Sequence, residues 1–250
     1  MNTLERIQAF EDLIKLSEEQ HQLIGTGNPL APILIIGRES AHNAKDRNEI
    51  DEHITINIKA VKDCFYNCDI TNLYLQVHPK EIGRTWNVYQ KLVDFILYDS
   101  QQIRGPLTPL PFGAWTFVSE MNNTACPKTV GAEDRRRPDY FRHRFFQDFP
   151  VTILACSNYI ENKEGNWQIN NIFGVTFDET NGERKYGKGN WYFIHKSADK
   201  KRLVIHTRQL SQNVSGEMLR DMAKTIRDHL ITNEKFPNHY LFQSCHGTVP

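Results

Sequence analysis

The fold class is decided by one stretch, PILIIG at residues 32–37. It is a short, continuous apolar run that ends at a glycine, and such a run is typical of a strand buried on both faces of a parallel sheet. Three further apolar runs, at residues 115–118, 151–156 and 203–205, have the same character. We therefore expect four strands in one mostly parallel sheet.

Helical patterns separate these runs. Apolar residues recur at helical spacing over residues 3–20, which predicts an amphipathic N-terminal helix. Ser215, followed by Glu217 in the first turn, predicts the start of a last helix. Further helices are expected over residues 48–67, 85–98 and 139–148.

A β-hairpin is expected before the last strand, at about residues 172–194, where two apolar runs flank a turn region rich in Gly and Asn. The alternation of strands and helices predicts an α/β fold, a three-layer α/β/α sandwich around a central four-stranded, mostly parallel sheet. The chain shows no internal repeat and no long linker, so we expect a single domain over residues 1–250.

The composition excludes some function classes. The chain has 30 basic residues (lysine and arginine) and 30 acidic residues (aspartate and glutamate). A uniformly basic nucleic-acid binder is therefore excluded, although a local basic face is not. The five cysteines are scattered and odd in number, which favours a reducing compartment over a secreted disulfide framework. We expect a cytoplasmic protein, associated with the nucleoid in a prokaryote. No apolar window approaches the roughly 18 residues of a membrane span, so no membrane partner is expected.

Polar residues follow each run of the predicted sheet. Glu39 follows the first, Glu120 and Asn122 the second, Asn158 the third, and His206 the fourth. Ligands of such sheets bind beyond the carboxyl ends of the strands, so these side chains predict a site. Each also has a structural explanation, such as a helix cap, a turn or a hydrogen-bonded histidine at the rim.

These residues resemble the uracil-DNA glycosylase superfamily. In that family a Gly-Gln-Asp-Pro-Tyr-His motif follows the first strand, and GRESAH at residues 37–42 matches it with Glu39 at the acidic position. The family's second motif, His-Pro-Ser-Pro-Leu-Ser, follows the last strand, and HTRQLS at residues 206–211 keeps its His, Leu and Ser. Between the two motifs, Asn122 and then the dipeptides at 126–127 and 137–138 occur in the family's order.

The resemblance extends from about residue 30 to residue 231, with departures in both motifs. Ser40 and Ala41 replace the Pro and Tyr of the first motif, and residues 207–209 replace Pro-Ser-Pro in the second. The iron–sulfur branches of the family carry an N-terminal cysteine pair, whereas no cysteine precedes Cys64 here. We therefore expect no metal and no other cofactor.

The resemblance implies a role for each motif residue. A glycosylase must flip its target base out of the stack. Glu39 would hold and deprotonate the attacking water, and His206 would donate a hydrogen bond to the pyrimidine O2. Asn122, or Glu120 two residues earlier, would read the base, and Leu210 would fill the space that the base leaves. The other residues expected at the base are Ser40, Ala41 and Asn158.

Two basic clusters predict a phosphate-binding rim. Residues 135–144 contain five arginines, and four lysines and arginines lie in residues 196–202. Phosphate contacts supply affinity without sequence preference. We expect DNA contacts from Arg136, Arg137, Arg142, Lys201, Arg208 and Ser211. Either cluster alone is equally well explained as a solvated charged face.

We therefore predict a monofunctional DNA glycosylase that acts as a monomer on DNA and leaves an abasic site, in repair or in defence against foreign modified DNA. Ala41 stands where a uracil-specific relative has a Tyr that excludes the thymine methyl group, so we expect uracil or a 5-substituted pyrimidine as the target. Tyr74 or Trp191 could restore that barrier. Two alternatives remain: a catalytically weak DNA-binding or sensing module, and a small-molecule nucleoside or nucleotide hydrolase.

Overall fold

The computed structural model describes residues 1–38, 47–67, 84–98, 112–123, 137–187, 189–211 and 213–236. Its α-helices are α1 Thr3–Gln20, α2 Arg47–Asn67, α4 Arg84–Tyr98, α5 Phe112–Trp115, α6 Arg144–Gln147, α7 Gln168–Phe173 and α8 Gly216–Thr232. Two short 3-10 helices are η2 Pro138–Arg142 and η3 Ser157–Tyr159. The helices expected at residues 3–20, 48–67 and 85–98 are thus confirmed to within one residue at each end.

The strands form a mixed sheet. They are β1 Thr26–Gly27, β2 Ile33–Gly37, β3 Thr116–Glu120, β4 Val151–Leu154, β7 Thr176–Phe177, β8 Glu183–Lys185, β9 Trp191–Lys196 and β10 Leu203–Thr207. The order is β1-β3-β2-β4-β10-β9-β7, with β8 also paired to β9. Strands β3, β2, β4 and β10 run parallel to one another, and the other strands pair antiparallel. The α/β class is confirmed, but the described residues form one mixed sheet of eight strands where a four-stranded sheet with an inserted hairpin was expected.

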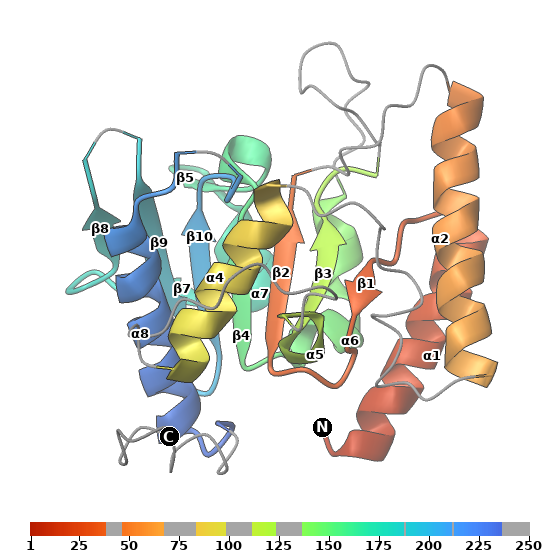
Figure 1. Ribbon diagram of the computed structural model, residues 1–250, viewed down its shortest axis with the longest axis horizontal. Helices are drawn as coiled ribbons and strands as arrows, with labels where there is room; N and C mark the ends of the chain where they lie inside the picture. Colours follow the sequence, from red (N-terminus) through yellow and green to blue (C-terminus); the bar gives the residue numbers. More distant parts are fainter. Residues whose placement is uncertain are drawn as a thin grey trace, which may run out of the picture.

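Helices cover both faces of this sheet (Figure 1). Side chains of a strand alternate between faces, so Leu34 and Ile36 pack with α1, α6 and α7, while Ile33 and Ile35 pack with α4 and α8. Figure 1 shows α4 and α8 together on the near face. Phe10 of α1 lies against the ring of Phe117 of β3 with a centroid separation of 5.6 Å. The sheet is therefore buried on both sides, which explains the continuous apolar run at residues 32–37.

Helix ends follow the local sequence. At α1, the Asn2 side chain accepts a hydrogen bond from the Glu5 amide, and the Glu5 side chain accepts one from the Asn2 amide. At α8, the Ser215 hydroxyl accepts a hydrogen bond from the Met218 amide, which confirms the expected start of the last helix.

The expected hairpin at residues 172–194 needs correction. Ile172 and Phe173 belong to α7, because with Ile169 they recur at helical spacing and are buried in the core. Gly174, in the left-handed conformation with φ 58°, ends that helix. Both β7 and β8 then pair antiparallel with β9, so the segment extends the sheet as an antiparallel edge.

Two other expected elements end differently. The helix expected over 139–148 is divided into η2 and α6, because His143 is extended (ψ 137°) and its ring accepts a hydrogen bond from the Phe145 amide. Trp115 ends α5 instead of opening a strand. A two-stranded hairpin, β5 Asn162–Lys163 with β6 Asn166–Trp167, was not expected.

A search of the described helices for a segment both long and apolar enough to cross a bilayer finds none.

Candidate functional site

The carboxyl ends of the parallel strands lie at one edge of the sheet, the upper edge in Figure 1. Gly37 of β2 is in register with Glu120 of β3, and Leu154 of β4 is in register with His206 of β10. The segments that follow these strands are therefore neighbours, and Asn122 and Asn158 belong to them. Glu39, Ser40, Ala41 and Arg136 lie outside the described residues.

His206 joins two of these strand ends. Its Nε2 atom lies 2.8 Å from the carbonyl oxygen of Ser157, the residue that opens η3 after β4. Ser157 has a left-handed backbone conformation (φ 52°), which is uncommon for a residue with a Cβ. A carbonyl can only accept, so His206 Nε2 must carry the hydrogen of this bond.

The His206 ring is buried against aromatic side chains. Its centroid lies 5.2 Å from that of Trp191 and 6.1 Å from that of Phe193, and the residue is 6% exposed. Burial lowers the pKa of His206, while the hydrogen bond to Ser157 and the charge of Glu161 act in the opposite direction. The ring is therefore neutral at pH 7, and its Nδ1 atom is then an acceptor.

Glu120 packs over the glycine that ends β2. A Cβ added to Gly37 would overlap the Oε2 atom of Glu120, so a larger residue at position 37 would have to displace this carboxylate. Burial, and secondarily the charge of Glu120, raises the pKa of the Cys156 thiol and of the Tyr89 hydroxyl. Both groups are therefore neutral, and Cys156 is not an activated nucleophile.

The two asparagines after β3 have different positions. The backbone amide of Asn122 donates to the carbonyl of Arg38 at 2.7 Å, which fixes Asn122 beside the end of β2. The Asn123 side chain accepts from the Leu23 amide at 2.7 Å and donates to the His21 carbonyl at 3.0 Å. Asn123 thus fastens the segment after α1, and Asn122 is the amide at the site.

Arg137 does not face solvent as a phosphate-binding residue would. It is 7% exposed, and its Nε and Nη2 atoms donate to the carbonyl of Glu120 at 3.0 and 2.9 Å. Its guanidinium lies 4.4 Å from the ring centroid of Tyr140. Burial lowers the pKa of Arg137 to about 10, so it stays charged at neutral pH. Its guanidinium holds the end of β3, which does not fit the role expected from the sequence.

Leu210 is also in a different environment from the one its expected role requires. It is fully buried in the core between the sheet and helices α4 and α8, so in this conformation it does not project toward a ligand. Ser211 and Arg208, on either side of it, are partly exposed, and Arg208 donates to the carbonyl of Gly189 at 3.0 Å.

The two remaining basic residues lie apart from His206. Lys201 is exposed and precedes β10, whereas His206 is near its end, so the strand separates them. Arg142 is exposed at the end of η2 and donates to Asp139 at 2.9 Å and to the carbonyl of Asn171 in α7 at 2.7 Å.

The hairpin β5–β6 follows the site directly and carries an exposed aromatic residue. Figure 1 shows β5 at the same edge as the end of β10. The Asn162 side chain accepts from the Ile169 amide at 3.0 Å and donates to Asn170 at 2.7 Å, which ties the hairpin to α7. Trp167 at the end of β6 is 48% exposed. The sequence pattern did not single out this residue.

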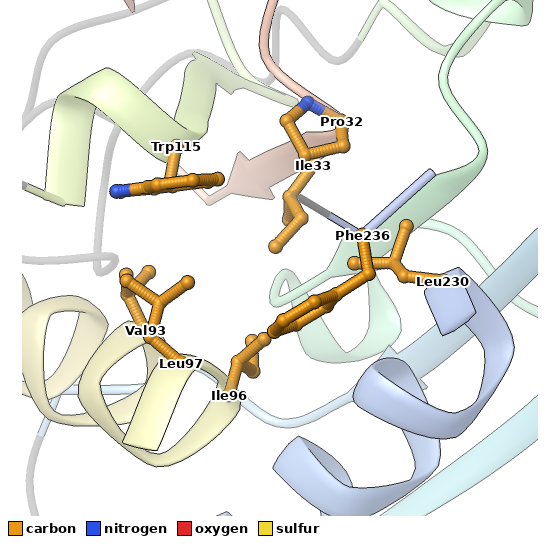
Figure 2. Close-up of a pocket in the computed structure, with 8 residues that line it drawn as sticks. All are labelled: Pro32, Ile33, Val93, Ile96, Leu97, Trp115, Leu230 and Phe236. Carbon is orange, nitrogen blue, oxygen red and sulfur yellow. The ribbon is translucent and has the colours of Figure 1, made fainter. Parts of the chain in front are cut away.

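Two pockets lie at the opposite edge of the described sheet. Figure 2 shows an apolar pocket lined by Pro32 and Ile33 at the start of β2, by Trp115, and by residues at the ends of α4 and α8. A second pocket of about 500 Å³ lies near it, lined among others by Arg6, Asp148 and Lys201. Neither pocket includes a strand-end residue of the carboxyl edge, so we place the candidate site by its side chains.

No model of a known protein family and no curated protein matches the chain.

Proposed function

We propose that the protein is a DNA glycosylase, related to the uracil-DNA glycosylase superfamily, that removes uracil or a 5-substituted pyrimidine from DNA as a monomer. The observation that supports this most is the position of His206, which lies near the end of β10, against Trp191 and at the same edge as Asn122. An imidazole, an amide and an aromatic wall suit recognition of a flipped base by its polar edge and its face.

The reaction breaks the bond between C1′ of the sugar and N1 of the base, and the oxygen of a water molecule bonds to C1′. The proton of that water passes to the carboxylate of Glu39, and the base leaves with the bonding electron pair. Negative charge then develops on the base, so a positioned hydrogen-bond donor lowers the barrier. Asn122 holds the base by its Watson–Crick edge, because an amide both donates and accepts.

His206 supplies the donor when it is protonated. Its Nε2–H is already engaged with the carbonyl of Ser157, so donation to O2 of the base uses Nδ1. Nδ1 carries a hydrogen as well only in the imidazolium. The lowered pKa of His206 makes this form the minority at neutral pH. The rate of excision should therefore increase as the pH falls toward that pKa.

A DNA-binding module with weak excision is the second candidate. It is favoured by the burial of Leu210 and Arg137, which removes one expected wedge and one expected phosphate contact. Arg142, Arg208 and Ser211 would remain as contacts in either case.

The test uses end-labelled oligonucleotides that each contain one uracil or one 5-hydroxymethyluracil. Alkali cleavage reports abasic sites, and mass spectrometry identifies the released base. If the protein is a glycosylase, the base is released, and His206→Ala reduces the rate of release roughly 10²- to 10⁴-fold. His229→Ala is the control, since His229 is partly buried and its Nε2 donates to the carbonyls of Pro150 and Lys201, near the opposite edge. Binding without release would favour the second candidate, and release from free nucleosides alone would contradict both.

A further inference from the structure

The guanidinium of Arg38 has an unusual environment. Arg38 directly follows β2, and its Cζ atom lies 4.3 Å from the ring centroid of Tyr159 in η3. Its Nε atom is buried and makes no hydrogen bond within the described ranges. A buried N–H group without a partner costs free energy, so such a group in a stable fold calls for an explanation.

The buried arginines of the described chain are satisfied by the protein itself. Arg6 donates to the carbonyls of Pro29 and Ala31, each at 2.8 Å. Arg227 donates to two carbonyls at the end of α4, at 2.7 and 3.0 Å. Arg137 donates to the end of β3 at 3.0 and 2.9 Å. Each of these three fastens backbone segments, whereas the described residues provide Arg38 with an aromatic face and no oxygen acceptor.

Arg38 is also at the centre of the candidate site. Its carbonyl accepts from the Asn122 amide at 2.7 Å, and the ring that it stacks on belongs to the same short helix as Ser157, the partner of His206. The positive charge of Arg38 and the negative charge of Glu120 act in opposite directions on the thiol of Cys156, which places all three groups near one another.

We propose that Arg38, whose guanidinium lies over the ring of Tyr159, binds an oxyanion of the substrate nucleotide. Stacking fixes the plane of a guanidinium but leaves the N–H groups at its edge directed outward, where they match the oxygens of an anion. This inference rests on the proposed function. Two oxyanions of such a substrate fit: a phosphate beside the flipped nucleotide, and the pyrimidine anion that departs.

The experiment compares Arg38→Gln with Arg220→Gln. Arg220 is a matched control, because its guanidinium also lies over an aromatic ring, that of Phe95 at 5.8 Å, but on α8 and away from the strand ends. Both variants are first checked for unchanged thermal unfolding, and Arg38→Lys is prepared as a variant that keeps the charge but loses the planar fork.

The first arm measures binding to an oligonucleotide whose target is 2′-fluoroarabino-uridine, a nucleotide that resists excision. One copy is fully charged, and others carry a single neutral methylphosphonate linkage beside the target. If Arg38 binds a phosphate, Arg38→Gln weakens binding of the charged copy about 10- to 100-fold. The copy whose methylphosphonate replaces the contacted phosphate should then bind wild type and Arg38→Gln with affinities within about threefold of each other. In that copy the phosphate contact of Arg38 is already absent.

The second arm measures single-turnover excision of uracil and of 5-fluorouracil, which is the better leaving group. If Arg38 binds the departing base, Arg38→Gln leaves binding unchanged and slows uracil more than 5-fluorouracil, with Arg38→Lys intermediate. If Arg38→Gln behaves like Arg220→Gln in both arms, the inference is overturned and the proposed function is left standing. A wild-type protein that binds no oligonucleotide and excises no base would overturn both.

Discussion

His206 and Ser157 are joined by a hydrogen bond of 2.8 Å that links the end of β10 to the turn after β4. The bond uses the Nε2 hydrogen of a ring that burial keeps neutral. Any second hydrogen bond that His206 donates must therefore come from Nδ1 of the protonated ring. This geometry connects the state of one imidazole to pH in a way that the sequence motif alone does not show.

The first prediction is a pH dependence of excision. Above the pKa of His206, which lies below the usual 6.5, the imidazolium fraction increases tenfold for each unit of pH lost. The single-turnover rate should therefore increase as the pH falls from about 8, continue to increase through pH 6.5, and level off only below the lowered pKa of His206. Stopped-time assays on a uracil oligonucleotide measure it. His206→Gln should be slow and nearly independent of pH over this range, and a wild-type rate that falls toward pH 6.5 would contradict the imidazolium role.

The second prediction concerns stability in acid. Burial, and then the nearby His206, lowers the pKa of His195 to about 4 from 6.5, and its Nδ1 has no hydrogen-bond partner in the part of the chain that the structure describes. Below pH 6.5 the unfolded chain binds a proton that the folded chain does not, so stability is complete above 6.5 and decreases as the pH falls. At one pKa unit per 1.36 kcal/mol, His195 accounts for a loss of about 2 kcal/mol by pH 5.

Urea unfolding at pH 7.5 and pH 5 measures this loss. His195→Phe should reduce the difference between the two pH values, because a phenyl ring fits beside Phe177 and takes up no proton. The control is His21→Asn, since the His21 side chain is 44% exposed and asparagine tolerates its left-handed conformation (φ 51°). Equal pH dependence in His195→Phe and wild type would show that other groups carry the loss.

Much of the fold could be predicted because its elements have simple periodicity. The run at residues 32–37 is apolar throughout since helices cover both faces, and α1 has a clear helical pattern with a cap. The short elements could not be predicted. Helix α7 has only six residues and includes two asparagines. Its helical conformation depends on the packing of Ile169, Ile172 and Phe173 in the core.

The candidate site was predictable in part for the same reason. Strand ends of a parallel sheet meet at one edge, so the approximate place of His206 and Asn122 follows from the order of apolar runs. The burial of Leu210 and Arg137 does not follow from a motif, because it depends on which neighbours surround them. The environment of Arg38 could not be predicted for a related reason, since a motif does not show that its buried Nε atom makes no hydrogen bond to the described residues.

The third prediction separates two candidates for the residue that enters the base stack. Leu210→Ala should destabilise the protein by about 2–5 kcal/mol, because Leu210 is a fully buried core residue. Trp167→Ala should change stability by less than about 0.5 kcal/mol, since Trp167 is 48% exposed. If Trp167 fills the vacated space, Trp167→Ala lowers excision from duplex DNA and leaves excision from single strands unchanged. Equal effects on both substrates would exclude that role.

The last prediction tests the close packing of Gly37 and Glu120. A Cβ at position 37 would overlap the Oε2 atom of Glu120, so Gly37→Ala must move this carboxylate. This carboxylate lies at the carboxyl edge of the sheet, where its charge and that of Arg38 both act on the thiol of Cys156. Displacement of this carboxylate should lower the rate of excision. The effect on stability should be small, because the flexible end of the Glu120 side chain can move away from the added methyl group.

The control is the same substitution in a Glu120→Ala background. The methyl group has room there, so Gly37→Ala should have little further effect. A double-mutant cycle on excision rate and thermal unfolding measures the coupling. Additive effects of the two changes would mean that the overlap is relieved by the backbone of β2 and not by Glu120.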